Sequence, residues 1–259
     1  MVRVLDVELY SFDIDKAVVD VEDTILSGIS PDNRLISATG AHGIITARKD
    51  KQFREILTQF YINLPDGMPG VWVGRMKGAK EMKRCYGPEF FRSLLISSAG
   101  KPIQHFFCGG KEGVADELKA ACETKFGNQN IVGTFCPPFR NLSDEEMQSL
   151  GTQINNSGAD IVWIGLSTPK QEKFAFRLKE FTKVNFIITV GAAFDFHTDN
   201  VKQAPAWVQK IGMEWFFRLL MEPKRLYKRY LEIVPLFIWY NIKDLCNNYF
   251  LKSKKKVIV

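Results

Sequence analysis

The sequence is poor in the residues that build metal sites. It has three histidines and five widely separated cysteines, none paired at zinc-ligand spacing: Cys85, Cys108, Cys122, Cys136 and Cys246. We therefore predict that the protein has no zinc site. Because disulfides persist mainly in oxidising compartments, an odd and scattered set of cysteines favours reduced thiols in a cytosolic protein.

Long apolar runs are also missing. No stretch reaches the roughly 18 uninterrupted apolar residues of a membrane-spanning helix. The nearest candidate, Leu231 to Leu251, is interrupted by Glu232, Pro235, Lys243 and Asp244. The first residues, MVRVLDVELY, carry acids where a secretory signal would have its apolar core, so we expect a chain that is not secreted.

Positive charge is present, and it is concentrated at one end. From Val201 onward the chain carries twelve Lys or Arg and four acids, a balance of +8, so the preceding residues carry −2 of the net +6. Such a distribution indicates a charged partner rather than a requirement of the fold. We divide the chain accordingly into a core, residues 1–200, and a helical, basic appendage, residues 201–259.

Within the core, short apolar runs alternate with helical patterns. The predicted strands are Arg3–Leu9, Arg34–Ala38, Tyr61–Leu64, Ile103–Cys108, Asn130–Gly133, Asp160–Leu166 and Asn185–Val190, with Val71–Val73 a further strand or loop. The predicted helices are Ile14–Leu26, Ile44–Phe60, Pro88–Ser98, Glu112–Lys125, a segment from the capping box at Ser143 to Asn156, and one opened by Pro169. This alternation predicts an α/β fold, a mainly parallel sheet with helices on both faces.

Ligands of such sheets bind beyond the carboxyl ends of the strands. The polar and glycine residues expected at those ends are therefore candidate site residues: Thr39, Asp66, Gly109, Gly110, Pro169, Lys170, Gln171, Glu172 and Asp195.

The sequence FFCGGKEGVADEL places Gly109 and Gly110 between a strand and a helix. Glycines there let backbone N–H groups approach a phosphate at the helix N-terminus. The dinucleotide fingerprint requires glycine at positions 108, 110 and 113, but position 108 is cysteine. The missing glycine argues against the alternative that the protein is a nucleotide-dependent oxidoreductase. The motif remains compatible with binding of a nucleotide diphosphate, and equally with a tight turn that binds no ligand.

Two further motifs have both a chemical and a structural interpretation. In LPDGMPGV, Asp66 fits a general base in a cleft, but Pro-Asp-Gly is also an ordinary turn sequence. In GLSTPKQEKF, the Gln171 amide suits recognition of a base or sugar, although Pro169 and Glu172 are also favoured at any helix start.

The appendage interleaves aromatic residues and cations. Core packing explains Trp215, Phe216 and their neighbours most simply, whereas the cations suit a diphosphate or anionic headgroups: Arg218, Lys224, Arg225, Lys228 and Arg229. From Leu231 the chain reads as an amphipathic, lysine-ended stretch, with Lys252–Lys256 at its end, that can lie on anionic lipid. The RNA-like combination of basic and aromatic motifs is absent, so we expect no nucleic-acid partner.

Several motifs together resemble the WecG/TagA/CpsF glycosyltransferases. The most specific are GAAFDF and APAWVQKIGMEWFFRLLMEPKRLYKRYL, which begin at Gly191 and Ala204. PDG followed by Gly78, GGKEGVA, IVGTFCPPF and ADIVWIGLSTPKQEKF precede them in the same order and spacing, so that the resemblance covers about Arg34 to Leu231.

The resemblance implies an inverting, metal-independent transferase with a Rossmann-like core. Such enzymes move a sugar (N-acetylmannosamine, its uronic acid or a hexose) from a UDP-sugar to a polyprenyl-diphosphate-linked acceptor at the cytoplasmic membrane face, for surface polysaccharide or teichoic acid. It assigns Asp66 as the base, Thr39 and Gln171 to the active site, and Arg218, Arg225 and neighbouring cations to phosphates and membrane. One departure is Thr39-Gly40-Ala41-His42, where the family usually has Thr-x-Asn.

The sequence leaves other properties open. These are the sugar, the acceptor, the polymer and the oligomeric state, because an appendage that packs on a second copy has the same sequence as one that packs on its own core. A non-enzymatic binder of membranes or nucleic acid, suggested by the basic tail alone, is the remaining alternative.

Overall fold

A computed structural model describes the backbone of residues 1–257 and the side chains of residues 1–247. The lysine cluster predicted to face lipid, Lys252–Lys256, lies outside the residues whose side chains are described.

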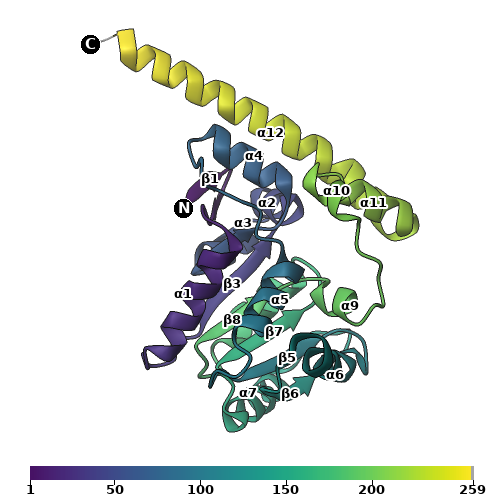
Figure 1. The fold of residues 1–259 in the computed structure, drawn as a ribbon. Coiled ribbons are helices and arrows are strands. Elements are labelled where there is room, and N and C mark those ends of the chain that lie inside the picture. The colour runs from purple at the N-terminus through teal and green to yellow at the C-terminus, as the bar shows by residue number, and fades with distance from the viewer. Residues whose placement is uncertain (258–259) are drawn as a thin grey trace.

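The core contains one six-stranded sheet in which all neighbouring strands are parallel (Figure 1). Its strand order is β4-β3-β8-β7-β5-β6. The strands are β3 (Arg34–Thr39), β4 (Ile62–Pro65), β5 (His105–Gly109), β6 (Ile131–Phe135), β7 (Ile161–Gly165) and β8 (Phe186–Thr189). The predicted mainly parallel sheet is confirmed, and all six carboxyl ends lie at one edge.

Helices cover both faces of the sheet, as predicted. Side chains alternate along each strand, so Leu35 and Ile187 pack with α2, α3, α7 and α8, whereas Ile36 and Ile188 pack with α1, α5, α6 and α9 on the other face. The helices are α1 (Ile14–Leu26), α2 (Ala41–Lys49), α3 (Lys51–Thr58), α4 (Met68–Met76), α5 (Gly87–Ser97), α6 (Val114–Phe126), α7 (Asp144–Ser157), α8 (Lys170–Leu178), α9 (Ala193–His197), α10 (Ala206–Lys210), α11 (Glu214–Met221) and α12 (Pro223–Val257).

Three local predictions are wrong, each because of a turn or a cap. The predicted strand Arg3–Leu9 is an antiparallel hairpin, β1 (Val2–Val4) and β2 (Val7–Leu9), which reverses through Leu5 at φ 52°. The predicted helix Ile44–Phe60 is two helices, because Asp50 has extended backbone and its side chain caps α3 by accepting from Phe53 N at 3.0 Å. Val71–Val73 belongs to α4, which Pro69 opens.

The capping box predicted at Ser143 is confirmed. Glu146 N donates to Ser143 Oγ at 3.2 Å, and Ser143 N donates to Glu146 Oε2 at 2.7 Å, so two backbone donors at the start of α7 are satisfied.

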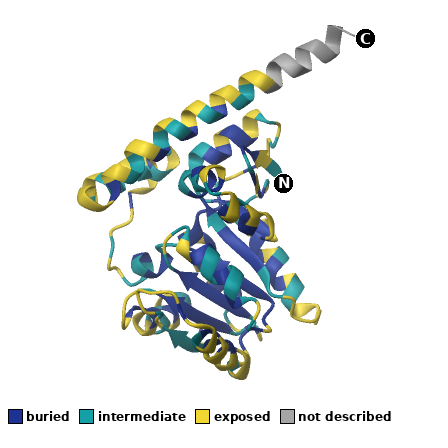
Figure 2. Cartoon of the chain, turned by 180° about the vertical axis from the view of Figure 1, so that it is seen from behind, coloured by how far each residue is buried: buried dark blue, intermediate teal, exposed yellow. Residues whose placement is uncertain are grey.

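Helix α12 runs across the top of the core as one long rod (Figure 1). One side packs on α2, where Leu226, Ile233 and Phe237 are buried. Its other side carries exposed apolar residues: Leu231, Ile238, Trp239 and Ile242. Figure 2 shows the same division, with dark and yellow segments alternating along α12. The appendage is thus anchored to the core and still presents apolar surface.

Gly109 ends β5 where the backbone must pass very close to β7. Its φ is 140°, and a Cβ added there would lie 2.6 Å from the carbonyl oxygen of Gly165. Neither the backbone conformation nor the available space accepts a side chain.

We predict that Gly109→Ala destabilises the fold by about 3 kcal/mol or more, because overpacking adds to backbone strain. Gly127→Ala is the matched control, since Gly127 also has a positive φ, 66°, but has open space around its Cβ position. It should cost only about 1 kcal/mol. Urea unfolding followed by circular dichroism measures both, and equal losses would contradict the prediction.

Candidate active site

Asp66 lies at the carboxyl edge of the sheet, directly after β4. Its Oδ1 accepts from Gly87 N at 2.8 Å, at the N-terminus of α5. A Cβ added at Gly40, after β3, would lie 3.5 Å from Oδ2, and Oδ2 has no hydrogen-bond partner among the described residues. One carboxylate oxygen is therefore fixed by the helix start, while the other can take a proton.

Burial raises the pKa of Asp66 above its ordinary value, whereas the Arg84 guanidinium and the hydrogen bond from Gly87 oppose this rise. A carboxyl with a raised pKa is a stronger base than an exposed aspartate, which suits a group that must accept a proton near neutral pH.

Arg84 joins this part of the core to the appendage. Its Nε donates to the backbone oxygen of Asp66 at 2.7 Å, and its Nη1 donates to Gln209 in α10 at 3.2 Å. Nη2 forms an ion pair with Glu214 of α11, and the Tyr86 hydroxyl donates to the same carboxylate at 2.7 Å. Both ionic side chains are largely buried, so this contact ties α10 and α11 to the sheet edge.

Three predicted site residues, Thr39, Gln171 and Glu172, are brought together below this edge, and all three are buried. They belong to a group of hydrogen-bonded side chains that we name the strand-end network: Ser37, Thr39, Asn63, Thr168, Gln171 and Glu172. The Gln171 Oε1 accepts from Gly191 N at 3.0 Å, and its Nε2 donates to Glu172 at 2.9 Å. The hydrogen bonds described for Thr39, Gln171 and Glu172 are thus all made to other groups of this chain.

The glycine turn after β5 lies beside the end of β7. Gly110 N donates to Gly165 O at 3.0 Å, and Cys136, after β6, contacts the Gly110 oxygen at 3.6 Å. The turn continues through the exposed Lys111 to Gly113, the N-cap of α6. Backbone N–H groups at a helix start and one exposed lysine can bind a phosphate.

Asp195 lies in α9, within reach of cations from both parts of the chain. Burial raises its pKa, and Lys111, Arg225 and Arg218 act in the opposite direction. Arg218 also acts on the pKa of Asp66, so its charge reaches both carboxyls. The glycine turn and the appendage therefore meet around Asp195.

Arg218 is positioned by α11 and is not fully satisfied. Its Nε is buried without a hydrogen-bond partner in the described chain, and its Nη2 lies 3.8 Å from Glu222. Its guanidinium carbon stands 5.7 Å from the Phe196 ring centre. Since buried polar groups normally have partners, Arg218 keeps hydrogen-bonding capacity that the described chain does not use.

The other cations differ in their surroundings. Arg225 pairs with Glu222 at 2.7 Å. Arg229 is half-buried. Burial of the His42 ring is the main cause that lowers the pKa of His42 to about 4, and the positive charge of Arg229 is the second cause. His42 is therefore a neutral imidazole near the cations. Lys228 is exposed, with its amine 5.9 Å from the Tyr227 ring centre, and Lys170 is exposed beside Pro169, whose peptide bond with Thr168 is cis.

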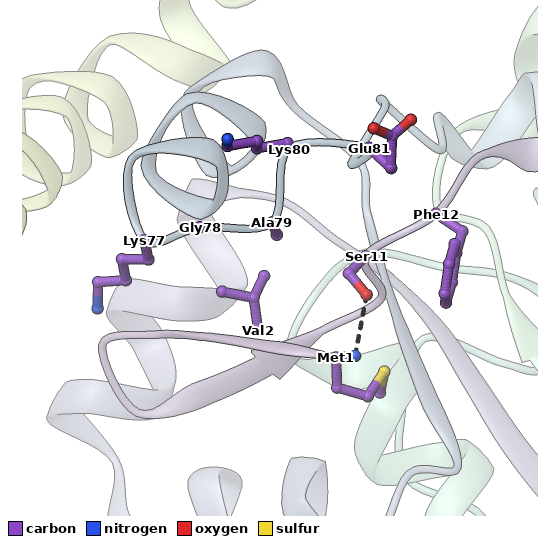
Figure 3. Close-up of a pocket in the computed structure, with 9 residues that line it drawn as sticks. All are labelled: Met1, Val2, Ser11, Phe12, Lys77, Gly78, Ala79, Lys80 and Glu81. Atoms are coloured by element: carbon purple, nitrogen blue, oxygen red, sulfur yellow. Dashed lines mark hydrogen bonds between the residues drawn. The ribbon is translucent and has the colours of Figure 1, made fainter.

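A separate hollow of about 420 Å³ lies at the N-terminal hairpin (Figure 3). There the Met1 ammonium donates to Ser11 Oγ at 2.9 Å. None of the predicted site residues lines it; its lining residues are Met1, Val2, Ser11, Phe12, Lys77, Gly78, Ala79, Lys80 and Glu81. No cluster of three or more His, Cys, Asp or Glu among the described residues is placed to hold a metal ion. That the reaction needs no metal stays a prediction.

Two of the residues at this edge were not among the predicted site residues. Arg84 carries no local signal, because its partner Glu214 is 130 residues away in the sequence. Lys111 stands inside the glycine turn. Its position after two glycines and just before a helix start is the sequence signal that could have identified it as a site residue.

The fold and the site define an α/β protein with two partly or fully buried carboxyls, Asp66 and Asp195, and several arginines at the carboxyl edge of a parallel sheet. This arrangement can activate a hydroxyl and bind an anionic leaving group. Comparison with known sequences shows the family: the chain belongs to the glycosyl transferase WecG/TagA/CpsF family, whose sequence model matches residues 2–250.

One curated relative is the N-acetylglucosaminyldiphosphoundecaprenol N-acetyl-beta-D-mannosaminyltransferase of Bacillus subtilis (strain 168). It is 29% identical over 202 residues, which are 77% of this chain and 75% of the relative. The family membership predicted from the motifs is confirmed, and it displaces both the oxidoreductase and the non-enzymatic alternatives.

We predict that Glu214→Gln loosens α10 and α11, because it removes the charge that pairs with buried Arg84. The cost should be about 2 kcal/mol. Hydrogen exchange measured by mass spectrometry should increase in residues 204–222. The exposed pair Arg92–Glu89 supplies the control, and Glu89→Gln should change little. Unchanged exchange in Glu214→Gln would show that the pair does not hold the appendage.

Proposed function

We propose that the protein transfers a sugar of the N-acetylmannosamine type from a UDP-sugar to an acceptor sugar on a polyprenyl diphosphate, with inversion at the anomeric carbon. Its family is one of glycosyl transferases, and the Bacillus subtilis relative is named as a mannosaminyltransferase that acts on N-acetylglucosaminyldiphosphoundecaprenol. The product would enter a surface polysaccharide or teichoic acid.

The observation that carries this proposal is the position of Asp66. One carboxylate oxygen is held by the N-terminus of α5, the other is unpartnered, and the charge of Arg218 reaches the same carboxyl. In the proposed step, Asp66 Oδ2 takes the proton of the acceptor hydroxyl. The hydroxyl oxygen then forms a bond to the anomeric carbon while the bond to the UDP oxygen breaks.

The donor diphosphate would lie between the glycine turn and the appendage. Lys111 offers an exposed ammonium just before α6, and Arg218 offers a guanidinium whose Nε has no partner in the described chain. Charge that develops on the departing UDP is thereby stabilised by groups already in place, and no metal is needed for the step. Asp195, near the same cations, would contact the donor sugar.

The acceptor's lipid explains the apolar surface of the appendage. Among the described residues no helix is both long and apolar enough to span a bilayer. The appendage nevertheless leaves large apolar side chains in solvent: Trp207 is 68% exposed, Leu231 72% and Trp239 64%. Exposed apolar residues beside Lys224 and Lys228 are typical of a surface that rests on anionic lipid. We propose that this side of α10–α12 faces the cytoplasmic membrane surface.

We predict that Asp66→Asn lowers the transfer rate by at least about 100-fold, because a general base typically contributes 10²–10⁴. The amide oxygen can still accept from Gly87, so the fold and UDP affinity should stay near wild type. Transfer is measured by mass spectrometry with a short-chain lipid-linked acceptor, and UDP binding by calorimetry.

Asp160→Asn is the matched control. Asp160 also accepts from a backbone N–H, that of Gln104 at 2.8 Å, and also has a raised pKa, but it precedes β7 at the opposite edge of the sheet. This variant should keep its activity. Wild-type transfer by Asp66→Asn would remove the base assignment.

We also predict that the double variant Leu231→Gln, Trp239→Gln binds vesicles of anionic lipid at least about tenfold more weakly, because each apolar side chain loses burial worth roughly 1.5–3 kcal/mol. Phe139→Gln is the control, since Phe139 is 96% exposed but lies after β6, away from α12. Vesicle flotation at low salt measures the partitioning. Equal flotation of the double variant and wild type would contradict the proposed membrane face.

A further inference from the structure

Glu172 is a buried carboxyl with neutral neighbours. It is 1% exposed, and its Oε1 accepts from Gln171 Nε2 at 2.9 Å, Thr168 Oγ1 at 2.9 Å and Ser37 Oγ at 3.3 Å. Desolvation is the largest influence on its pKa and raises it; the hydrogen bonds of these three uncharged residues oppose the rise.

The charged groups near Glu172 in sequence are engaged elsewhere or lie in solvent. Lys173, next in α8, pairs with Asp50 at 3.1 Å, and Lys170 is exposed. An ionised carboxylate without a cation in such a place is strongly disfavoured, because nothing compensates its lost hydration.

The second oxygen of Glu172 receives no hydrogen bond from the described residues. Oε2 is buried and lacks a partner there, and the buried Thr189 Oγ1 is likewise unpartnered. Ser37, which donates to Glu172, stands opposite Thr189 in the β3–β8 register. Unlike Glu22, which also has an unpartnered oxygen but pairs with Lys101, Glu172 has no cation among its described hydrogen-bond partners, so a neutral acid avoids leaving an unpaired charge there.

We propose that Glu172 is held as a neutral carboxylic acid and acts as a positioning residue that fixes the carboxyl ends of β3 and β8 around the active site. Gln171, oriented by Glu172, accepts from Gly191 N, which begins the turn toward Asp195. Thr39, linked to Glu172 through Ser37, accepts with its backbone oxygen from Asp66 N at 3.3 Å. The catalytic consequence rests on the proposed function; the protonation state does not.

The stability of the fold should depend on pH through Glu172. A carboxyl whose pKa is higher in the folded than in the unfolded state stabilises the fold least at high pH, because the unfolded chain then ionises more readily. In Glu172→Gln the side-chain amide keeps one acceptor oxygen and a donor N–H group but cannot ionise. It should therefore raise the melting temperature by about 3 °C at pH 8, and the gain should vanish near pH 4, below the ordinary glutamate pKa of about 4.3.

Two controls isolate this effect. Glu22 is also a buried carboxyl, but it pairs with Lys101 at 2.8 Å, so Glu22→Gln should show no gain at pH 8. Leu178→Ala creates a cavity in the same helix without touching the network, and its loss of stability should be independent of pH.

Hydrogen exchange tests the positioning directly and without a substrate. Glu172→Ala should increase exchange in residues 189–193, which include the Gly191 amide, more than in β5, whereas Glu172→Gln should keep wild-type protection. A melting temperature of Glu172→Gln below wild type at pH 8 would overturn the neutral acid, and unchanged exchange in Glu172→Ala would overturn the positioning role.

Transfer activity gives a third readout. The ratio of activity at alkaline pH to activity at neutral pH should be low in wild type, because Glu172 ionises, and higher in Glu172→Gln, which cannot ionise; the same alkaline fall in both proteins would overturn the neutral acid. If wild type itself transfers no sugar, the proposed function fails, and the melting and exchange results decide the assignment of Glu172 alone.

Discussion

The position of a single guanidinium underlies the architecture of the site. Arg84 donates to the backbone oxygen of Asp66 with one nitrogen and pairs with Glu214 of the appendage with another. This contact adds to the packing of α12 on α2 and links α10 and α11 directly to the sheet edge that carries Asp66. With it, Arg218 is brought to where its charge reaches both Asp66 and Asp195. The site is therefore composite, and its completeness depends on an interaction between segments far apart in the sequence.

The buried polar residues below this edge have a different task from those that face it. Thr39, Gln171 and Glu172 hydrogen-bond to one another, to neighbouring side chains and to the Gly191 amide, so they support the strand ends; their predicted contacts with a substrate stay a prediction. Asp66 Oδ2, Lys111 and Arg218 Nε are the groups with remaining capacity. The ends of β3 and β4 and the start of the turn after β8 are thus tied together from beneath the groups that face outward.

Much of the fold could be predicted because its signals are local. Apolar periodicity gave the sheet and α1 with correct bounds, and the Ser143 capping box depends on residues three apart. The errors also have local causes: Asp50 caps a second helix in the middle of one periodic run, and Leu5 reverses what reads as a continuous strand. Arg84, by contrast, could not be identified from sequence, because its role depends on Glu214 and on the docking of α11. Glu172 was predicted to bind substrate from its place in a motif, and only its neighbours in the fold show that its carboxyl is enclosed.

The central claim is that this edge transfers a sugar from a nucleotide to a lipid-linked acceptor in one displacement. The most direct measurement incubates the purified protein with UDP-N-acetylmannosamine and a short-chain polyprenyl-diphosphate N-acetylglucosamine, in buffer with a metal chelator, and determines the product's anomeric configuration by NMR. The account predicts a disaccharide product whose new linkage is β, inverted from the α-linked donor. A product with retained configuration, or one that forms only when a divalent metal is restored, would contradict it.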